Sequence, residues 1–108
     1  MREDSIMPTH WTENFRIARA HPALSGHFPG RPVVPGVTLL DRVAAAVENR
    51  TGAHIAALPQ VKFLRPLLPE QDATLTLEAS GRSIRFHIAQ KDETIATGVA
   101  TLDADAQV

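Results

Sequence analysis

The sequence predicts an α+β domain in which a curled antiparallel sheet of about five strands wraps around one central helix. Two observations favour this class. The run from Val37 to Glu48 is rich in helix formers and almost lacks a polar face, and the segments after it alternate between apolar and polar residues. Short turns between alternating segments are typical of an antiparallel meander. Because a helix that is apolar all round is normally buried on most sides, we expect the sheet to curl around it.

The central helix has recognisable start and stop signals. Pro35 suits a first helical turn, and Asn49 and Gly52 supply a stop about 15 residues later. The interior contains Leu39, Leu40, Val43 and three consecutive alanines, so burial rather than solvation is expected for this element.

Five extended segments are expected, and all of them belong to a single domain covering residues 1–108. Residues 1–12 form a loose lead-in and residues 103–108 a frayed tail. Turns are expected at residues 81–82 and 91–92. The predicted strands are 13–20 with Phe15 and Ile17 on one face, 54–64 broken at Pro59, 72–79, 84–88 and 93–102.

Composition excludes several classes of function. The formal net charge is -1, so no global field favours nucleic acid or an anionic membrane. The chain has no cysteine, which excludes disulfides, thiolate metal ligands and a cysteine nucleophile. The polar first five residues lack the apolar core of a signal peptide, and no apolar run approaches the ~20 residues that span a bilayer. We therefore expect a cytoplasmic protein with no membrane span.

Residues 21–36 are the most informative stretch. Four prolines and three glycines exclude a regular element there, yet Phe28, Val33 and Val34 supply apolar anchors. A rigid loop of this kind is more often a shaped site than a linker. It contains His27, the side chain best suited to move protons near neutral pH, and it ends at Gly36, where unpaired helix amides form a ready-made oxyanion site.

Asp41 is out of place on the predicted helix. It lies five residues past Gly36, too deep in the helix to be a cap, and its helical neighbours are mostly apolar. A carboxylate on such a helix is costly unless it is exposed, paired or used. Taken singly, a solvated Asp41 and a structural His27 are the ordinary interpretations. Taken together with Gly36, they favour an acid–base site beside an oxyanion-binding helix terminus.

Two motifs resemble a known family. Residues 26–37, GHFPGRPVVPGV, closely resemble the GHFPGxPxxPGV signature of bacterial 3-hydroxyacyl-acyl-carrier-protein dehydratases, and a carboxylate follows the histidine by fourteen residues. Residues 59–69, PQVKFLRPLLP, are similar to a second strand motif of that family. The resemblance covers roughly residues 15–102. The short N-terminus and the loop at His21 look most like the short dehydratases of aryl-polyene clusters.

The resemblance implies a hotdog fold and the removal of water from a 3-hydroxyacyl thioester to give the trans-2-enoyl thioester. His27 would take the α-proton, Asp41 would protonate the departing hydroxyl, and the Gly36 amide would bind the thioester carbonyl. It implies no metal or redox cofactor. In the family the histidine and carboxylate of one site come from different subunits, so a homodimer or a heterodimer with another hotdog subunit is expected. The acyl chain would lie in an apolar tunnel lined by Phe28, Val33, Val37 and Leu40.

Several alternatives stay open at this point. Arg31, Lys62 and Arg65 are expected to contact an acidic carrier protein, although they also fit ordinary solvated charges. Coenzyme A is the other carrier to consider. An acyl thioesterase on the same fold, or a non-catalytic or partner-dependent subunit, would use the same architecture. Sequence departures from the family occur at Asp41, where the non-isomerising branch usually has Glu, at Val37, where some relatives have Cys, and at Glu70, where Gly is common. The remaining histidines are not spaced as metal ligands, and we interpret them as surface or interface residues: His10, His54 and His87.

Overall fold

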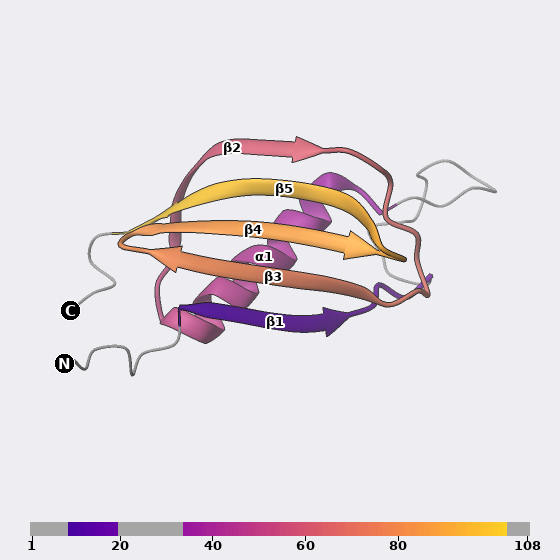
Figure 1. Ribbon diagram of the computed structural model, residues 1–108, viewed down its shortest axis with the longest axis horizontal. Coiled ribbons are helices and arrows are strands. Elements are labelled where there is room, and N and C mark those ends of the chain that lie inside the picture. Colours follow the sequence, from indigo (N-terminus) through magenta and orange to yellow (C-terminus); the bar gives the residue numbers. More distant parts are fainter. Residues whose placement is uncertain (1–8, 20–33, 104–108) are drawn as a thin grey trace.

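The computed structural model of the chain describes residues 9–19 and 34–103. One helix and one five-stranded antiparallel sheet make up the fold, and the sheet order is β1-β3-β4-β5-β2 (Figure 1). The predicted fold class is confirmed. The elements are β1 His10–Phe15, α1 Gly36–Thr51, β2 Ile55–Phe63, β3 Ala73–Ser80, β4 Ser83–Gln90 and β5 Glu93–Leu102.

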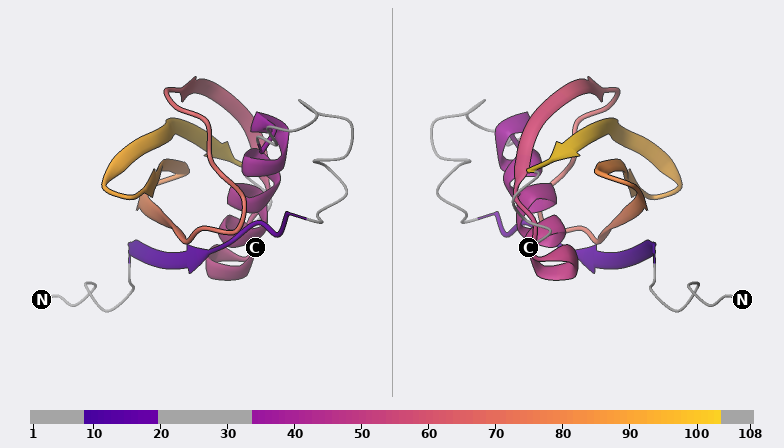
Figure 2. Two further views of the ribbon diagram at one scale, coloured as in Figure 1. Left: turned by 90° about the vertical axis from the view of Figure 1, so that its right-hand side faces the viewer. Right: turned by 90° about the vertical axis from the view of Figure 1, so that its left-hand side faces the viewer.

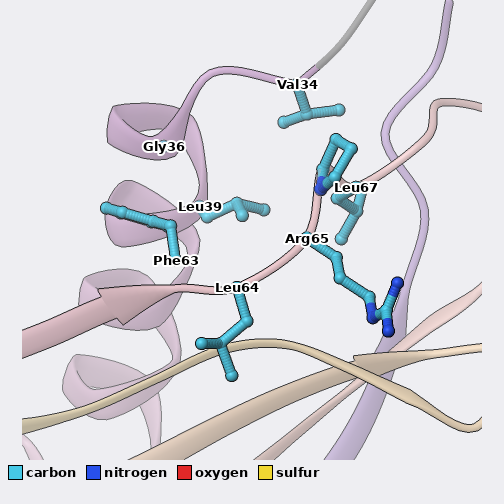
Figure 3. A pocket seen from close by; sticks show the side chains of 8 residues that line it. Val34, Gly36, Leu39, Phe63, Leu64, Arg65 and Leu67 are labelled. Atoms are coloured by element: carbon cyan, nitrogen blue, oxygen red, sulfur yellow. The ribbon is translucent and has the colours of Figure 1, made fainter.

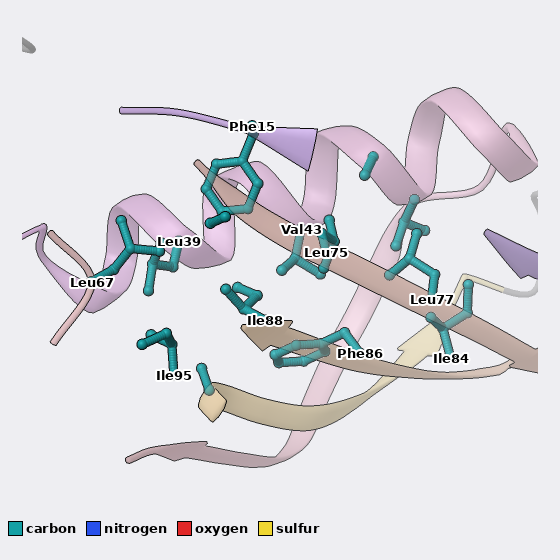
Figure 4. Close-up of a cluster of buried hydrophobic side chains, with 14 of the residues drawn as sticks. Phe15, Leu39, Val43, Leu67, Leu75, Leu77, Ile84, Phe86, Ile88 and Ile95 are labelled. Carbon is teal, nitrogen blue, oxygen red and sulfur yellow. The ribbon is translucent and has the colours of Figure 1, made fainter. Parts of the chain in front are cut away.

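The core lies between α1 and the concave side of the curled sheet (Figure 2). Alternate residues of the three central strands point inward, as the sequence pattern predicts. They meet one side of α1 to form a continuous apolar cluster (Figure 4). Its most completely buried members are Val43, Val47, Leu67, Leu75, Leu77, Ile84, Phe86, Ile88 and Ile95.

The first strand was predicted too late in the chain. It runs over His10–Phe15 rather than 13–20, and its register with β3 explains the difference. Pairing proceeds from His10↔Glu78 to Phe15↔Ala73, and β3 begins at Ala73, so the residues after Phe15 have no strand to pair with. Trp11, placed in the lead-in by the sequence, instead lies in this strand and packs against the core.

Pro59 does not break the second strand, contrary to the prediction. The strand continues through it, and the ladder with β5 shifts register between Ala57 and Gln60. Proline is tolerated there because β2 is an edge strand of the sheet. A Cβ atom on Gly98 would lie only 2.5 Å from the carbonyl oxygen of Gln60 and from the Phe86 ring, so the close packing at this position of β5 requires glycine.

The prediction that α1 is buried on most sides is wrong within one chain. Its buried residues lie on one face and are Leu39, Val43, Ala46 and Val47. The opposite face is exposed at Asp41, Ala44 and Ala45, and Val37 is 65% exposed. The sheet curves over one side only, so burial within the chain does not account for the apolar character of the other side.

The two predicted hairpin turns are confirmed. Ser80 pairs with Ser83, and Gln90 pairs with Glu93, so each turn contains two residues. Gly81 has φ 60, whereas Lys91 and Asp92 have φ 52 and 64. The Lys91–Asp92 turn thus has positive φ at both central residues, which is the pattern of a type I′ turn. Glycine is strongly preferred at the second position of such a turn.

Introducing glycine at one turn and removing it from the other should therefore change the free energy of unfolding in opposite directions. We expect Asp92→Gly to raise the free energy of unfolding by about 0.5 kcal/mol, since it relieves a left-handed conformation that Asp only tolerates. Gly81→Ala, the matched exchange at the other turn, should lower it by about 1 kcal/mol. Urea unfolding of both variants measures this, and a stabilising Gly81→Ala would contradict the backbone argument.

Candidate active site

The N-cap residue of α1 gives the helix no side-chain cap. Pro35 occupies the N-cap position and makes no side-chain cap, and the first turn contains no acidic residue. Thr38 and Leu39 donate their amides to the Pro35 carbonyl at 3.0 and 3.4 Å. The amides of Gly36 and Val37 precede this first hydrogen-bonded turn and have no acceptor within the helix. This end of the helix therefore presents two backbone donors at the positive end of the helix dipole, an arrangement that favours an oxyanion.

An open cavity of about 450 Å³ lies directly beside this helix terminus (Figure 3). Leu39 faces it from α1, and the chain that leaves β2 forms its other wall. Among its lining residues in the described part of the chain, Arg65 alone is charged. The lining is Val34, Gly36, Leu39, Phe63, Leu64, Arg65, Pro66 and Leu67. An apolar cavity with backbone donors at one point suits an acyl group that carries a single polar carbonyl.

The cavity wall belongs to the loop of residues 64–72, and a buried glutamine holds this loop in place. Gln90, at the end of β4, is 5% exposed. Its Oε1 accepts the Leu68 amide at 3.0 Å, and its Nε2 donates to the carbonyls of Leu68 at 3.0 Å and Gln71 at 3.3 Å. The loop begins with the Leu64 and Arg65 amides bonded to the Ile95 carbonyl of β5, and the Gln90 side chain satisfies three backbone groups further along it.

The same loop anchors both described ends of the segment that carries His27. On one side, the Val34 amide donates to the Leu67 carbonyl at 3.2 Å. On the other, the Glu70 amide donates to the Ile17 carbonyl at 2.8 Å, and the Glu70 carboxylate accepts the Arg19 amide at 2.7 Å. The described residues on either side of 20–33 are thereby both held by this loop.

Glu70 itself has φ 64, in the left-handed region that favours glycine. This positive φ explains why glycine is common at the position of Glu70 in the dehydratase family. The glutamate tolerates the conformation here while its carboxylate holds the Arg19 amide.

Asp41 does not face this cavity. It is exposed, and it lies two residues after Leu39, which corresponds to about 200° around the helix. Because Leu39 points into the cavity, Asp41 points to the opposite side of α1. Within a single chain, Asp41 and the cavity therefore lie on opposite sides of α1.

The other predicted site residues divide into three groups. Leu40 is half-buried against the core, whereas Val37 is exposed beside the helix terminus. Lys62 and Arg65 are exposed, and the Arg65 guanidinium lies 3.9 Å from Glu93, an exposed pair of little energetic weight. The remaining residues lie outside the described part of the chain: His27, Phe28, Arg31 and Val33.

Sequence reasoning gave no role to Phe63, Leu64, Leu67 or Gln90. The first three belong to the motif at residues 59–69, and its apolar residues next to a proline were the available signal. Gln90 carried no signal, because a polar residue at the end of a strand is usually solvated.

Polar residues away from the cavity have local partners. His54 lies 3.0 Å from Glu48 on the surface, and His87 shares a 3.0 Å hydrogen bond with Thr94. The Arg42 guanidinium lies 5.0 Å from the centroid of the Phe15 ring. Among residues 9–19 and 34–103, no cluster of His, Asp and Glu could hold a metal ion, and no helix could span a membrane.

A curled antiparallel sheet packed on one helix, with an open cavity at the helix N-terminus, defines a hotdog-fold protein. A family model of ApeI-like dehydratases matches residues 4–99. The chain belongs to this ApeI-like dehydratase family.

Individual relatives agree with this assignment. The 3-hydroxyacyl-[acyl-carrier-protein] dehydratase FabZ of Haemophilus influenzae is 30% identical over 99 residues, which cover 82% of this chain and 62% of that protein. The chain thus spans about three-fifths of the length of this relative. Among solved structures, the dehydratase heterocomplex ApeI:P from Xenorhabdus doucetiae has a TM-score of 0.80 at 23% identity, covering 93% of this chain and 91% of that one. An acyl-CoA hydrolase from Staphylococcus aureus shares the fold with a TM-score of 0.58 at 18% identity, covering 91% and 66%.

Removal of the Gln90 side chain should loosen the cavity wall. We expect Gln90→Leu to lower the free energy of unfolding by about 2–4 kcal/mol, because three backbone groups of the loop lose their partner in a buried place. Gln60→Leu, on exposed β2, is the matched control and should stay within about 0.5 kcal/mol of the wild type. Chemical denaturation measures the free energy of unfolding of both variants. Equal losses of stability in the two would argue against the role of Gln90 in holding the loop.

Proposed function

We propose that the protein is a dehydratase that converts a 3-hydroxyacyl thioester into the trans-2-enoyl thioester. The observation that carries this proposal is the apolar cavity that ends at the uncapped amides of Gly36 and Val37. Val34, which adjoins the segment containing His27, lines the same cavity, and family membership supports the reaction class.

Three groups divide the reaction between them. The imidazole of His27 takes a proton from C2, and the charge that develops on the thioester oxygen is stabilised by the Gly36 amide. The C3–O bond then breaks as Asp41 donates a proton to the departing hydroxyl, so that water leaves and the C2–C3 double bond forms. Proton return from the imidazolium to the carboxylate resets the site. Each positioned acid or base contributes ~10²–10⁴ in rate, and an oxyanion donor contributes ~10²–10³.

The reaction requires two chains in this scheme. Asp41 lies on the opposite side of α1 from the cavity, so the carboxylate of one subunit would serve the His27 of the other. The exposed side of α1 supports such an assembly, since Val37, Ala44 and Ala45 give it an apolar surface beside Asp41. The partner is either a second copy or another hotdog subunit, as in the ApeI:P heterocomplex.

The thioester carrier is proposed to be an acyl carrier protein, as in the name of the FabZ relatives. Arg65 at the cavity rim and exposed Lys62 on β2 carry positive charge where a carrier would approach, and Arg31 is proposed to act with them. Coenzyme A is the competing carrier, and comparison of the two thioesters in one assay separates them.

A mass-resolved assay tests the reaction itself. We expect a 3-hydroxyacyl thioester to lose one water, and His27→Ala or Asp41→Asn to lower the rate at least about 100-fold because each removes a proton-transfer group. His54→Ala, a surface exchange, is the control. Release of free acid would instead identify a thioesterase, and water loss that survives His27→Ala unchanged would rule out the assigned base.

Mixing of the two inactive variants tests the shared site. Randomly mixed dimers of His27→Ala and Asp41→Asn contain one intact site in half of the molecules, so about one quarter of the wild-type activity should return. Sites contained within one chain would regain nothing. If the purified wild type is inactive but becomes active with a related hotdog subunit, the homodimer is excluded in favour of the heterodimer.

A further inference from the structure

Phe63, the last residue of β2, packs directly on Gly36. A Cβ atom on Gly36 would lie 2.7 Å from Cζ of the ring and 3.0 and 3.1 Å from the two Cε atoms. The tip of the ring therefore covers the first residue of α1 and leaves no room for even one methyl group there (Figure 3).

This contact places the ring next to the proposed oxyanion donor. The amide nitrogen and the Cβ position of a residue are both bonded to Cα and lie about 2.5 Å apart. A ring carbon 2.7 Å from that Cβ position is consequently within about 5 Å of the Gly36 nitrogen. If the oxygen of a thioester binds at about 2.9 Å from this nitrogen, the C2 atom of the acyl group lies in the same region.

The ring is a wall of the cavity and is not part of the core. Phe63 is 52% exposed, and it lines the cavity together with Leu64, which is 56% exposed. The three atoms nearest to the Gly36 Cβ position all belong to Phe63. Leu64 therefore shapes the same cavity without standing closest to the helix terminus, and it provides a matched comparison.

We propose that Phe63 is a specificity-determining residue that restricts the site to acyl thioesters without a branch at C2. The inference rests on the proposed function, because it assumes that the thioester oxygen binds at Gly36. An unbranched C2 carries only hydrogens beside the ring, and one of them is removed in the reaction. A methyl group at C2 would need the space that the ring tip fills, since apolar atoms pack at about 4 Å.

The position of the ring predicts which property of the substrate is selected. Phe63 lies at the thioester end of the cavity, so its removal should change discrimination at C2 more than discrimination of chain length. One methyl group in an apolar pocket is worth about 10–200-fold in selectivity.

The experiment compares 3-hydroxyhexanoyl and 2-methyl-3-hydroxyhexanoyl thioesters of N-acetylcysteamine. Each diastereomer of the branched substrate is offered separately, so that the hydrogen to be removed is available in at least one. The wild type should favour the unbranched substrate at least about tenfold in kcat/KM, and Phe63→Ala should reduce this ratio about tenfold. Phe63→Leu, which keeps more of the side chain, should give an intermediate ratio. Leu64→Ala should change both rates together and leave their ratio within about twofold of the wild type.

The outcomes distinguish a failure of the Phe63 proposal from a failure of the dehydratase proposal. Equal turnover of both substrates by the wild type, or an unchanged ratio in Phe63→Ala, overturns the role of Phe63 while the dehydratase stands. Absence of water loss from both substrates in the wild-type assembly overturns the dehydratase instead. Melting temperatures of the variants accompany the assay, and the half-exposed position of Phe63 predicts that they change little.

Discussion

Burial of one side of α1 against the concave side of the sheet fixes the positions of the other site elements. Val43 and Val47 are fully enclosed there, and Leu39 continues the same face toward the cavity. Because side chains on a helix keep a fixed angular spacing, this contact also sets where every other residue of α1 points. It places the Gly36 amide at the cavity and turns Asp41 away from it.

The loop of residues 64–72 is the second element that the site depends on, because it forms one wall of the cavity. Gln90 supplies it with three hydrogen bonds from the end of β4, and the loop in turn holds Val34 on one side and Arg19 on the other. A segment without strand pairing can form one wall of a defined cavity only if its backbone groups are satisfied in this way. The cavity therefore depends on a buried polar residue that lies outside it.

The two sides of α1 have separate roles under the proposed function. One side completes the core and the cavity, and the other presents Asp41 within an apolar surface that the chain does not cover. An exposed helix side with apolar residues around a carboxylate is costly for an isolated chain, but it suits a site shared between two subunits. Phe63 then shapes the space in front of the oxyanion donor from the edge strand of the sheet.

Most of the fold was determined by the sequence alone. Strict alternation over residues 73–79 and 84–88 specified the inward faces of β3 and β4, and Gly52 specified the end of α1, because local periodicity and backbone preference act over a few residues. The motif around His27, Gly36 and Asp41 identified the family and the chemistry to look for. Only the tertiary structure decided that β1 ends at Phe15, where β3 offers no further partner, and that Pro59 bends an edge strand without breaking it. It also decided that Phe63 covers Gly36, that Gln90 is buried, and that Asp41 faces away from the cavity. These are contacts between residues far apart in the chain, and no local pattern encodes which of them will meet.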